Sequence, residues 1–596
     1  MLRHTFLSRV LYLSVRDCSV VFRRFSERME RAVVRCVPCD PKLTISFTLN
    51  GSQKHMLRDQ TEELGKVLAR ISNGIIKSKS KGKRSKISKS SEAAAENLPD
   101  PVVRLFFNGD SVSEDSINSE AWQDGAVLHV GENKYRIERN PPSFTTAELP
   151  ASVLSGFPVC PRLEIEFGHL KDCKFTWYKE RSPNAHAQQQ EQHPTESTES
   201  SELGGSELNT CWLEAGSERV YTPSNLDIGL KLKLKCTPGD GNARYGLTKE
   251  LVTPEAVEAG PGVCTFDNRH MYTRKVTDAT TVRVVSYNIL ADIYAQTELS
   301  KTVLYPYCAP YALGLDYRQS LIKKELSGYN ADIVCLQEVD KGVFSDSLCP
   351  ALDAFGMDGV FRVKEKQHEG LATFYRRSKF RLLGQHDVML SEALTTDAVH
   401  SALLEKVSTN PTLMEKVVQR STTLQVTVLQ SVGDPSKIVY VGNTHLYWHP
   451  KGSNVRLIQV AVALQHLKRV TEEHPGTLIF CGDFNSTPSS GLFQLLSQGS
   501  VPENHSDWES NGPEELIQME LLSPFQLNSA CGEPAYTNYV GGFHGCLDYI
   551  FMEPRALQVE QVIPLPSHQE VTTYQALPSV AHPSDHIALV CDLKWK

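Results

Sequence analysis

The sequence predicts an α/β fold for the C-terminal half of this chain, preceded by a β-rich accessory domain. From about residue 281 to residue 596, short apolar runs alternate with segments of helical period, such as 317–326 and 454–470. Alternation of buried strands with helices is the pattern of a layered α/β domain. Between residues 40 and 265, short runs instead alternate apolar and polar residues, with turn residues between them. That pattern predicts antiparallel sheet.

The length and the composition limit the class of protein. A chain of 596 residues exceeds the size at which single hydrophobic cores stop growing, so two or more domains are expected. A net charge of −8 provides no overall attraction to nucleic acid, although a local basic groove and bound cations would still allow a nucleic-acid substrate. No apolar stretch is long enough to span a bilayer. We therefore predict no membrane span, and no feature of the sequence predicts a protein partner.

Changes in composition divide the chain. Residues 254–261 resemble a linker, so we place the accessory domain at 40–265 and the catalytic domain at 275–596. Two segments of the accessory domain have few large apolar residues. The segment near 77–95 begins by alternating Lys and Arg with Ser and Gly, and 184–209 is rich in Gln, Glu, Ser and Thr. Neither can be buried in a core, so both are predicted to be solvated or disordered insertions, with RNA contact or nuclear import as alternatives for the first.

The first residues predict import into mitochondria. Residues 1–25 interleave arginine with apolar residues and contain almost no acids, which is the composition of a mitochondrial transit peptide. Arg23-Arg24-Phe25-Ser26 also resembles a matrix-processing site with cleavage after Phe25. We therefore expect a transit peptide at 1–25 and a location in the mitochondrial matrix. A basic amphipathic helix on a membrane or partner surface is the alternative.

Six apolar runs in the C-terminal half are bounded by acids, amides or histidines. An unpaired charge buried at the end of a core strand costs several kcal/mol, roughly, so such ends need an explanation. If they converge on one edge of a sheet, they form a carboxylate-rich site that could bind a metal and hydrolyse a substrate. The residues are Asn288, Glu338, His445, Asp483 with Asn485, Asp548, and Asp585 with His586.

Several of these residues offer only oxygen ligands to a cation. Hard oxygen ligands suit Mg²⁺ or Mn²⁺ and argue against zinc. Magnesium sites with few protein ligands are completed by water and by substrate phosphate. Taken singly, Asp483 could belong to an ordinary turn after a strand, and Glu338 could be the charge at the start of a helix. The oxygen donors are Asn288, Glu338, Asp483 and Asn485.

The histidines indicate phosphodiester hydrolysis. A phosphoryl-transfer transition state gathers negative charge, which a metal ion and imidazoles can stabilise. Asp548 begins one apolar run and His586 begins another, so Asp548 is expected to hydrogen-bond His586 and fix its tautomer. His445 adjoins the same acidic edge. A structural role is the alternative for any single histidine. His449 and His582 flank the same loops, and an ordinary loop residue is the alternative for each of them.

Taken together, these motifs resemble the endonuclease/exonuclease/phosphatase family. They occur in the family's order and cover the whole C-terminal half, and six ordered motifs are specific where any one alone would be weak. Two further stretches, 304–318 and 534–548, resemble the deadenylase branch of the family. The six motifs are Ser286-Tyr287-Asn288-Ile289-Leu290-Ala291-Asp292, Leu336-Gln337-Glu338-Val339, Asn443-Thr444-His445-Leu446, Gly482-Asp483-Phe484-Asn485-Ser486-Thr487-Pro488, Leu547-Asp548-Tyr549-Ile550-Phe551 and Ser584-Asp585-His586.

The resemblance implies a four-layer α/β sandwich with the activity of a Mg²⁺-dependent exoribonuclease, with Mn²⁺ as the alternative ion. The implied substrates are 2′,5′-linked oligoadenylate and 3′ poly(A) tails of mitochondrial RNA, and the product is AMP. A phosphatase of the same fold and a non-catalytic RNA-binding protein are the alternatives. The segment 304–318 and Phe543 argue against the phosphatase. The complete set of motif residues argues against a protein without catalysis.

The resemblance also implies which residues hold the metal. Glu338 would be the main ligand, with Asn288 in support. Asp483 would activate the attacking water or hold a second metal, and Asn485 would orient that water and the phosphate. Asp585 would be an acid on the metal side of the site. These roles are implied by the family resemblance. The spacing of the residues does not show them.

The remaining roles concern the phosphate and the base. His586, oriented by Asp548, would contact the scissile phosphate, while His445 would stabilise the transition state or the leaving group. Phe543 matches a position that stacks on adenine in deadenylases, and a core aromatic is the alternative for it. Two further candidates for contacting substrate phosphate are Arg318 and Lys451.

Overall fold

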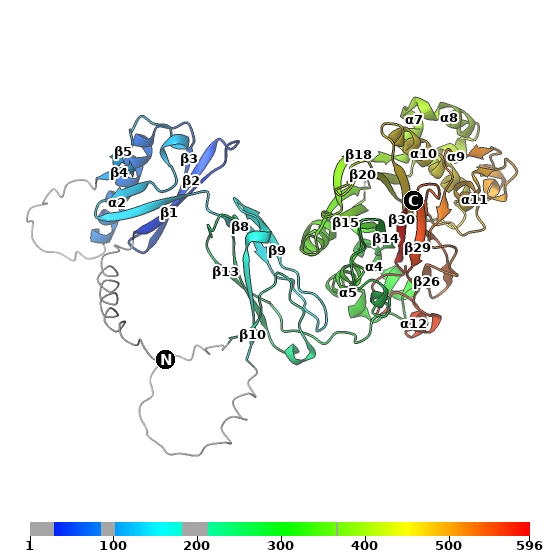
Figure 1. Ribbon diagram of the computed structural model, residues 1–596, viewed down its shortest axis with the longest axis horizontal. Coiled ribbons are helices and arrows are strands. Elements are labelled where there is room, and N and C mark those ends of the chain that lie inside the picture. The colour runs from blue at the N-terminus through cyan, green and yellow to red at the C-terminus, as the bar shows by residue number, and fades with distance from the viewer. Residues whose placement is uncertain (1–28, 85–101, 182–211, 365–366) are drawn as a thin grey trace, which may run out of the picture. The chain divides into compact units, whose positions relative to one another are not determined.

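Figure 1 shows the computed structural model of the chain, coloured from the N-terminus to the C-terminus. The predicted transit peptide at 1–25 and the predicted insertion at 184–209 lie outside the described residues, so both stay predictions. Among the described helices, none combines the length and the apolar character that a membrane span requires. The residues that the structure describes are 29–84, 102–181, 212–364 and 367–596.

The first compact unit is a mixed sheet with one long helix against it. Its strands follow the order β3-β2-β1-β7-β6-β4-β5, in which β1 and β7 run parallel. Buried residues alternate along β1 and β2, as the period-two pattern predicts. The unit comprises the described residues of Met1–Thr145, together with Ile165–Lys174 and Thr237–Thr248. Its main elements are β1 (Glu30–Cys36), β2 (Lys42–Leu49), β3 (Ser52–Asp59), α2 (Leu64–Arg84), β4 (Val103–Phe107), β5 (Asp110–Ser111), α3 (Asn118–Ala121), β6 (Val127–Val130) and β7 (Asn133–Arg139).

Helix α2 corrects one prediction. The basic run was expected to begin a loop at residue 77, but α2 continues to Arg84. Its apolar side chains Leu64, Leu68 and Ile71 recur at helical spacing and pack into the core of this sheet. Lysine and arginine are good helix formers, so the helix propagates into the basic run. The first strand also begins at Glu30, before the predicted domain boundary at 40, because its alternating pattern directly follows the arginine-rich start.

The second compact unit begins with a small sheet of order β11-β10-β12-β13. Strand β10 runs antiparallel to β11, and β12 runs antiparallel to β13. The predicted β-rich region therefore contains two separate sheets and a two-stranded pair, β8 with β9. The second unit comprises the described residues of Thr146–Glu164, Phe175–Cys236 and Lys249–Lys596. The strands are β8 (Ser143–Glu148), β9 (Arg162–Glu166), β10 (Lys174–Glu180), β11 (Trp212–Gly216), β12 (Leu232–Thr237) and β13 (Lys249–Val252).

The rest of the second unit contains two larger sheets, drawn from green to red in Figure 1. One has the order β16-β17-β15-β14-β30-β29, and the other β18-β20-β21-β22-β28-β25 with β19 paired to β20. The first is built from β14 (Thr281–Asn288), β15 (Ile333–Asp340), β16 (Met357–Val363), β17 (Glu369–Arg376), β29 (Leu557–Val562) and β30 (Leu589–Trp595). The second is built from β18 (Phe380–Gln385), β19 (Val388–Met389), β20 (Thr423–Ser431), β21 (Ile438–His445), β22 (Thr477–Asp483), β25 (Asn528–Ser529) and β28 (Asp548–Met552).

Three hydrophobic cores define four layers. One core joins the two sheets face to face, with Val284 on β14 packed in the same cluster as Val441 on β21. A second core packs α5 and α6 on the outer face of the first sheet, and a third packs α7 to α11 on the second. The predicted four-layer α/β sandwich is thus confirmed, and the predicted helices at 317–326 and 454–470 are α5 and α10. The helices are α4 (Asp292–Ala295), α5 (Leu315–Gly328), α6 (Cys349–Ala354), α7 (Leu390–Thr396), α8 (Ser401–Ser408), α9 (Pro411–Val418), α10 (Ser453–Thr471), α11 (Gly491–Gln498) and α12 (His568–Thr572).

Candidate active site

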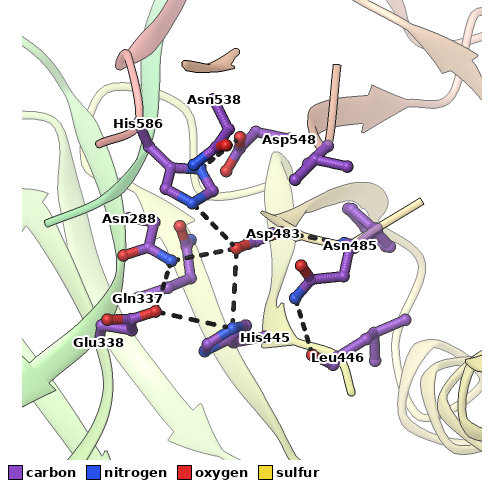
Figure 2. A network of polar contacts seen from close by, with 12 residues as sticks. Asn288, Gln337, Glu338, His445, Leu446, Asp483, Asn485, Asn538, Asp548 and His586 are labelled. Atoms are coloured by element: carbon purple, nitrogen blue, oxygen red, sulfur yellow. Dashed lines mark hydrogen bonds and ion pairs between the residues drawn. The ribbon is translucent and has the colours of Figure 1, made fainter. Parts of the chain in front are cut away.

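Strand ends bring the predicted residues to one edge of the two sheets (Figure 2). Strands β14 and β15 run parallel, which places Asn288 beside the residue before Glu338. Strands β21 and β22 are also parallel, with His445 opposite Asp483. Strand β28 runs antiparallel to β22, so its first residue, Asp548, lies opposite Asp483. The carboxyl ends of four strands and the start of a fifth therefore form one polar cluster.

Asn288 holds two acids of this cluster together. Its Nδ2 donates to Glu338 Oε1 and to Asp483 Oδ2, each at 3.0 Å. Its Oδ1 accepts the Leu290 N–H at 3.1 Å, and the Ala291 N–H donates to Glu338 Oε2 at 3.0 Å. In this arrangement Asn288 supports the carboxylates as a donor, and its own oxygen is engaged by the backbone. The amide oxygen has a second lone pair, so the predicted role of Asn288 as a supporting metal ligand stays a prediction.

The backbone is strained at two residues of the site, one acid and one amide. Glu338 and Asn485 have φ values of 54° and 48°, which residues with side chains rarely adopt. The ladder between β15 and β17 shifts register around Glu338, which turns this side chain away from the regular alternation. Gly482 allows β22 to pass close to β21, since a Cβ at this position would lie 2.2 Å from the Thr444 carbonyl oxygen. Strain of this kind costs roughly 1–3 kcal/mol per residue and is typical of functional sites.

Burial makes the clustered carboxylates hard to ionise. Burial, followed by the carboxylates of Asp585 and Glu369, raises the pKa of Glu338 to about 7. Burial, followed by the Asp548 carboxylate, also raises the pKa of Asp483. The Oδ1 atom of Asp548 is buried without a hydrogen-bond partner in the described part of the chain. A bound cation would offset both the desolvation and the mutual repulsion of these acids, so the residues fit a divalent metal ion.

Three side chains of the cluster lie close enough to share one ion, and Glu338 is not among them. One atom each of Asp483, Asp548 and His586 lie within 4.8 Å of one another and could hold a metal. The N–H of Asn485 donates to Asp483 Oδ1 at 2.9 Å, and its Nδ2 donates to the Leu446 carbonyl at 3.0 Å. That second bond leaves the amide oxygen of Asn485 for a cation or a water. The predominance of oxygen donors favours a hard divalent ion.

The predicted bond between Asp548 and His586 is present. The Nδ1 atom of His586 donates to Asp548 Oδ2 at 2.8 Å, and Thr537 Oγ1 donates to the same oxygen at 2.6 Å. Burial alone would lower the pKa of His586, but the carboxylates of Asp548 and Asp483 raise it well above its ordinary value. The Nε2 atom of His586 lies 3.6 Å from Asp483 Oδ2. His582 donates from Nε2 to the His586 carbonyl at 2.8 Å, so its role is structural.

His445 enters the cluster from the other sheet. Its Nε2 lies 3.7 Å from Asp483 Oδ2 and 3.9 Å from Glu338 Oε1. Burial, and then the charge of Lys364, lower the pKa of His445 well below its ordinary value. Two residues of the site were not among those predicted: Lys364, which contacts His445, and Glu369, which contacts Lys364. Glu369 is the first residue of the apolar strand β17 and so had the signal that identified the other acids, whereas Lys364 had none.

Asp585 faces the site from the loop that precedes β30. Its Oδ2 accepts the Tyr305 hydroxyl at 3.0 Å and the Asn538 amide at 3.3 Å. Its charge raises the pKa of Glu338, so the two acids are electrostatically linked. This placement agrees with the predicted role of Asp585 as an acid on the metal side, which stays a prediction.

The three residues predicted to contact substrate lie in different environments. Phe543 is 47% exposed, which excludes the alternative of a core aromatic. Arg318 is completely buried and donates to the carbonyl oxygens of Leu290 at 2.7 Å and Leu313 at 3.2 Å. The prediction that Arg318 contacts substrate is therefore wrong, because its guanidinium instead satisfies backbone carbonyls of the loops beside α5. Lys451 is exposed in the loop after β21, and its role stays a prediction.

A hairpin of β26 and β27 places Phe543 near the site. The Tyr539 N–H donates to the Asp585 carbonyl at 3.0 Å, and the Ile587 N–H donates to the Thr537 carbonyl at 2.7 Å. These bonds anchor the hairpin on the loop that carries His586. The hairpin that carries the exposed ring of Phe543 is therefore attached to the loop that carries His586. Its strands are β26 (Asn538–Val540) and β27 (Phe543–Gly545).

Comparison with known proteins agrees with this geometry. The model of the endonuclease/exonuclease/phosphatase family matches residues 285–586, from β14 to His586. The chain belongs to this family. A second model, described as the N-terminal domain of 2′,5′-phosphodiesterase 12-like proteins, matches residues 141–258. The family match spans all the acids, amides and histidines of the cluster.

Individual relatives extend the comparison. Human 2′,5′-phosphodiesterase 12 is 60% identical over 585 residues, which cover 95% of this chain and 94% of the relative. The CCR4-Not complex 3′-5′-exoribonuclease subunit Ccr4 of Schizosaccharomyces pombe is 30% identical over 349 residues, 52% of this chain and 49% of the relative. A crystal structure of ANGEL2, a 2′,3′-cyclic phosphatase, is 24% identical with a TM-score of 0.44 and covers 53% of this chain and 96% of that chain.

The family and the curated relatives establish the general class of activity. The chain is an enzyme, a hydrolase of the nuclease and phosphodiesterase class, as the sequence predicts. The predicted similarity to the deadenylase branch is also confirmed, and the similarity to 2′,5′-phosphodiesterase 12 extends over almost the whole chain.

Proposed function

We propose that the chain is a Mg²⁺-dependent 3′-exoribonuclease that hydrolyses 2′,5′-oligoadenylate and 3′ poly(A) tails of mitochondrial RNA and releases AMP. The observation that carries this proposal is the Asn288 bridge between Glu338 and Asp483, which lies beside the Asp548–His586 pair. Such a cluster of acids and imidazoles suits phosphodiester hydrolysis. The substrates are inferred from relatives whose names specify a 2′,5′-phosphodiesterase and a 3′-5′-exoribonuclease.

The acids and the amide prepare the attacking water. Mg²⁺, when bound by Glu338, Asp483 and Asn485, would supply positive charge to the phosphate oxygens. Asp483 accepts the proton of the water at a carboxylate oxygen and so acts as the general base. The amide oxygen of Asn485 orients this water toward phosphorus. A new P–O bond forms as the bond from phosphorus to the 2′ or 3′ oxygen of the preceding nucleotide breaks.

The two histidines stabilise charge on the phosphate from different sides. His586, held by Asp548, donates from Nε2 to a non-bridging oxygen, and its raised pKa keeps it protonated. His445 stays neutral and donates from its own Nε2 toward the leaving oxygen. The leaving oxygen takes up a proton from solvent and Asp483 releases its proton to solvent, so the net reaction adds one water across the ester and leaves AMP with a 5′ phosphate.

Adenine preference is assigned to Phe543. Its ring is exposed on the hairpin anchored to the loop that carries His586, where a terminal base could stack on it. Stacking of a base on an aromatic ring contributes roughly 1–3 kcal/mol. Lys451 is the remaining candidate for a contact with substrate phosphate.

Defined oligonucleotides test the proposed reaction. Purified protein is incubated with Mg²⁺ and with 2′,5′-linked oligoadenylate, 3′,5′-linked oligoadenylate, oligouridylate and oligocytidylate. Stepwise release of AMP, faster from adenylates than from the other homopolymers, is expected. The ratio of the two adenylate rates measures the linkage preference. Failure to cleave any oligonucleotide, with release of phosphate from a small phosphorylated substrate, would favour a phosphatase.

The location in the mitochondrial matrix is proposed on the composition of residues 1–25. Residues 1–30 are fused to a fluorescent reporter, and a second fusion replaces the arginines of this segment with glutamine. We expect the first fusion to be imported and the second to remain outside mitochondria. A diffuse signal from the unaltered fusion would contradict the proposal.

A further inference from the structure

A buried ion pair closes the turn between β16 and β17. The Lys364 N–H donates to the Glu369 carbonyl at 3.0 Å, and Lys364 Nζ donates to Glu369 Oε1 at 2.6 Å. The two side chains are 9% and 0% exposed. The hydroxyl of Tyr294 also lies 3.4 Å from Glu369 Oε1. Burying two charges costs free energy even when they are paired, so a role other than stability is the natural explanation.

The ammonium group of this pair touches a catalytic histidine. Lys364 Nζ lies 3.0 Å from His445 Nδ1. An ammonium group has only donors, so Nδ1 must be the acceptor of this hydrogen bond. In neutral imidazole the proton is then on Nε2. That atom faces Asp483 and Glu338, at 3.7 Å and 3.9 Å, and so points into the polar cluster.

We propose that Lys364, held by Glu369, is a positioning residue that fixes the tautomer and ring orientation of His445, so that Nε2–H is presented to the substrate. The inference rests on the proposed role of His445 as a donor. The other catalytic histidine has the opposite partner, because His586 Nδ1 donates to the Asp548 carboxylate. A carboxylate at Nδ1 supports a cationic ring, whereas an ammonium at Nδ1 supports a neutral one. The two partners thus divide the histidines into one charged and one neutral donor.

The contacts of Lys364 favour positioning over direct contact with substrate. Two of its three N–H donors are already directed at Glu369 and His445. Its side chain is almost completely buried, at 9% exposure. A lysine that bound substrate phosphate would be free of such partners and open to solvent. The predicted consequence is a loss of turnover with little change in substrate binding.

Kinetics of Lys364→Met test this consequence. Methionine keeps an apolar stem of similar length and removes the donor. We expect kcat for oligoadenylate hydrolysis to fall roughly 10- to 100-fold, the range found when partners that orient functional histidines are lost, with KM within about twofold of the wild type. Lys364→Arg restores a donor and should recover part of kcat. The control is Lys406→Met, the same change at an exposed position on α8, which should leave both constants unchanged.

A double-mutant cycle with His445→Ala separates positioning from other roles. If Lys364 acts through His445, Lys364→Met costs no further turnover once the imidazole is gone. Additive losses in kcat, or a large rise in KM for Lys364→Met alone, would overturn the proposal. The residual rate of His445→Ala must exceed the background rate, which is measured with the Asp483→Ala variant. If the wild type hydrolyses no oligonucleotide, the proposed function fails before this cycle applies.

A second variant guards against misfolding. Lys364→Met leaves the Glu369 carboxylate buried without its partner, which is costly. Lys364→Met combined with Glu369→Gln removes both charges. This double variant should fold with a thermal transition near that of the wild type and show the same loss of kcat as Lys364→Met alone. A folded double variant with normal kcat would refute the proposal.

Discussion

The substitution Asp548→Asn tests how the structure holds its charged histidine. The carboxylate accepts His586 Nδ1 at 2.8 Å and the Thr537 hydroxyl at 2.6 Å, and the aspartate is 1% exposed. Asparagine has nearly the same shape and keeps one oxygen as an acceptor, but it removes the negative charge. Without that charge the pKa of His586 falls, and the ring holds the proton that it donates to phosphate less firmly.

The size of the effect follows from these contacts. Loss of a proton donor in the transition state typically costs about 10²- to 10⁴-fold in rate, and we expect kcat to fall within this range. The cost in stability is smaller, about 1–3 kcal/mol, because His586 can release its proton and avoid an unpaired buried charge. Steady-state kinetics with oligoadenylate and urea unfolding measure the two quantities.

A matched control separates activity from stability. Asp592 forms a buried ion pair with Arg283, with oxygens 2.7 Å from Nε and 2.9 Å from Nη2. Arg283 lies five residues before Asn288 on β14, about 17 Å away at about 3.3 Å per residue. Asp592→Asn should therefore lose at least as much stability, since arginine cannot release its proton, and keep its kcat. A folded Asp548→Asn protein with the kcat of the wild type would refute the reasoning.

The pH dependence of the unfolding free energy, measured with metal chelated, provides a further check on the charge of His586. The folded pKa of His586 lies above its ordinary value, so its stabilising contribution is complete below the unfolded pKa of about 6.5 and is lost as pH rises through the folded pKa. The difference in unfolding free energy between the wild type and Asp548→Asn should therefore shrink from pH 6 to pH 9. A constant difference would show that the charge of His586 is not involved.

Three other substitutions have defined outcomes. Glu338 has a pKa raised to about 7, so its ionisation destabilises the fold as pH rises from its ordinary value through 7. With metal chelated at pH 8, the unfolding free energy of Glu338→Gln in urea should exceed that of the wild type by about 3 kcal/mol. The variant should also be inactive. A lower unfolding free energy would contradict the claim that burial of the Glu338 carboxylate destabilises its charged form. Phe543→Ala should raise KM for oligoadenylate about tenfold and reduce the preference for adenine over uracil, with an unchanged melting temperature; an unchanged KM would exclude stacking. Gly482→Ala should cost roughly 1–3 kcal/mol in unfolding free energy and lower kcat, because the added methyl group meets the Thr444 carbonyl, and wild-type values would contradict this close approach.

Much of the site was predictable because its residues stand at the ends of apolar runs in the sequence, where strands end. Asn288, Glu338, His445 and Asp483 each interrupt an apolar run, and parallel neighbours bring such ends to one edge of a sheet. The four-layer fold followed from the family resemblance that the same motifs carry. Period-two alternation also predicted the strands of the accessory region.

Other features were not predictable, for physical reasons that can be named. Arg318 has the charge of a phosphate ligand, but only the packing of α5 against the loop after β14 shows that backbone carbonyls enclose its guanidinium. Lys364 lies in a turn, and its link to His445 spans strands of both sheets. Helix α2 runs into the basic segment because its start is anchored by tertiary packing. In each case a contact distant in sequence decides the role of the residue.

The most direct test of the account is hydrolysis of oligoadenylate by Glu338→Ala and Asp483→Ala in the presence of Mg²⁺. Both residues accept a hydrogen bond from Asn288 and belong to the proposed metal and water site. Release of AMP should be abolished in both variants, while circular dichroism and thermal unfolding show that the proteins remain folded. Folded variants that release AMP at near the rate of the wild type would contradict the assignment of this cluster as the catalytic site.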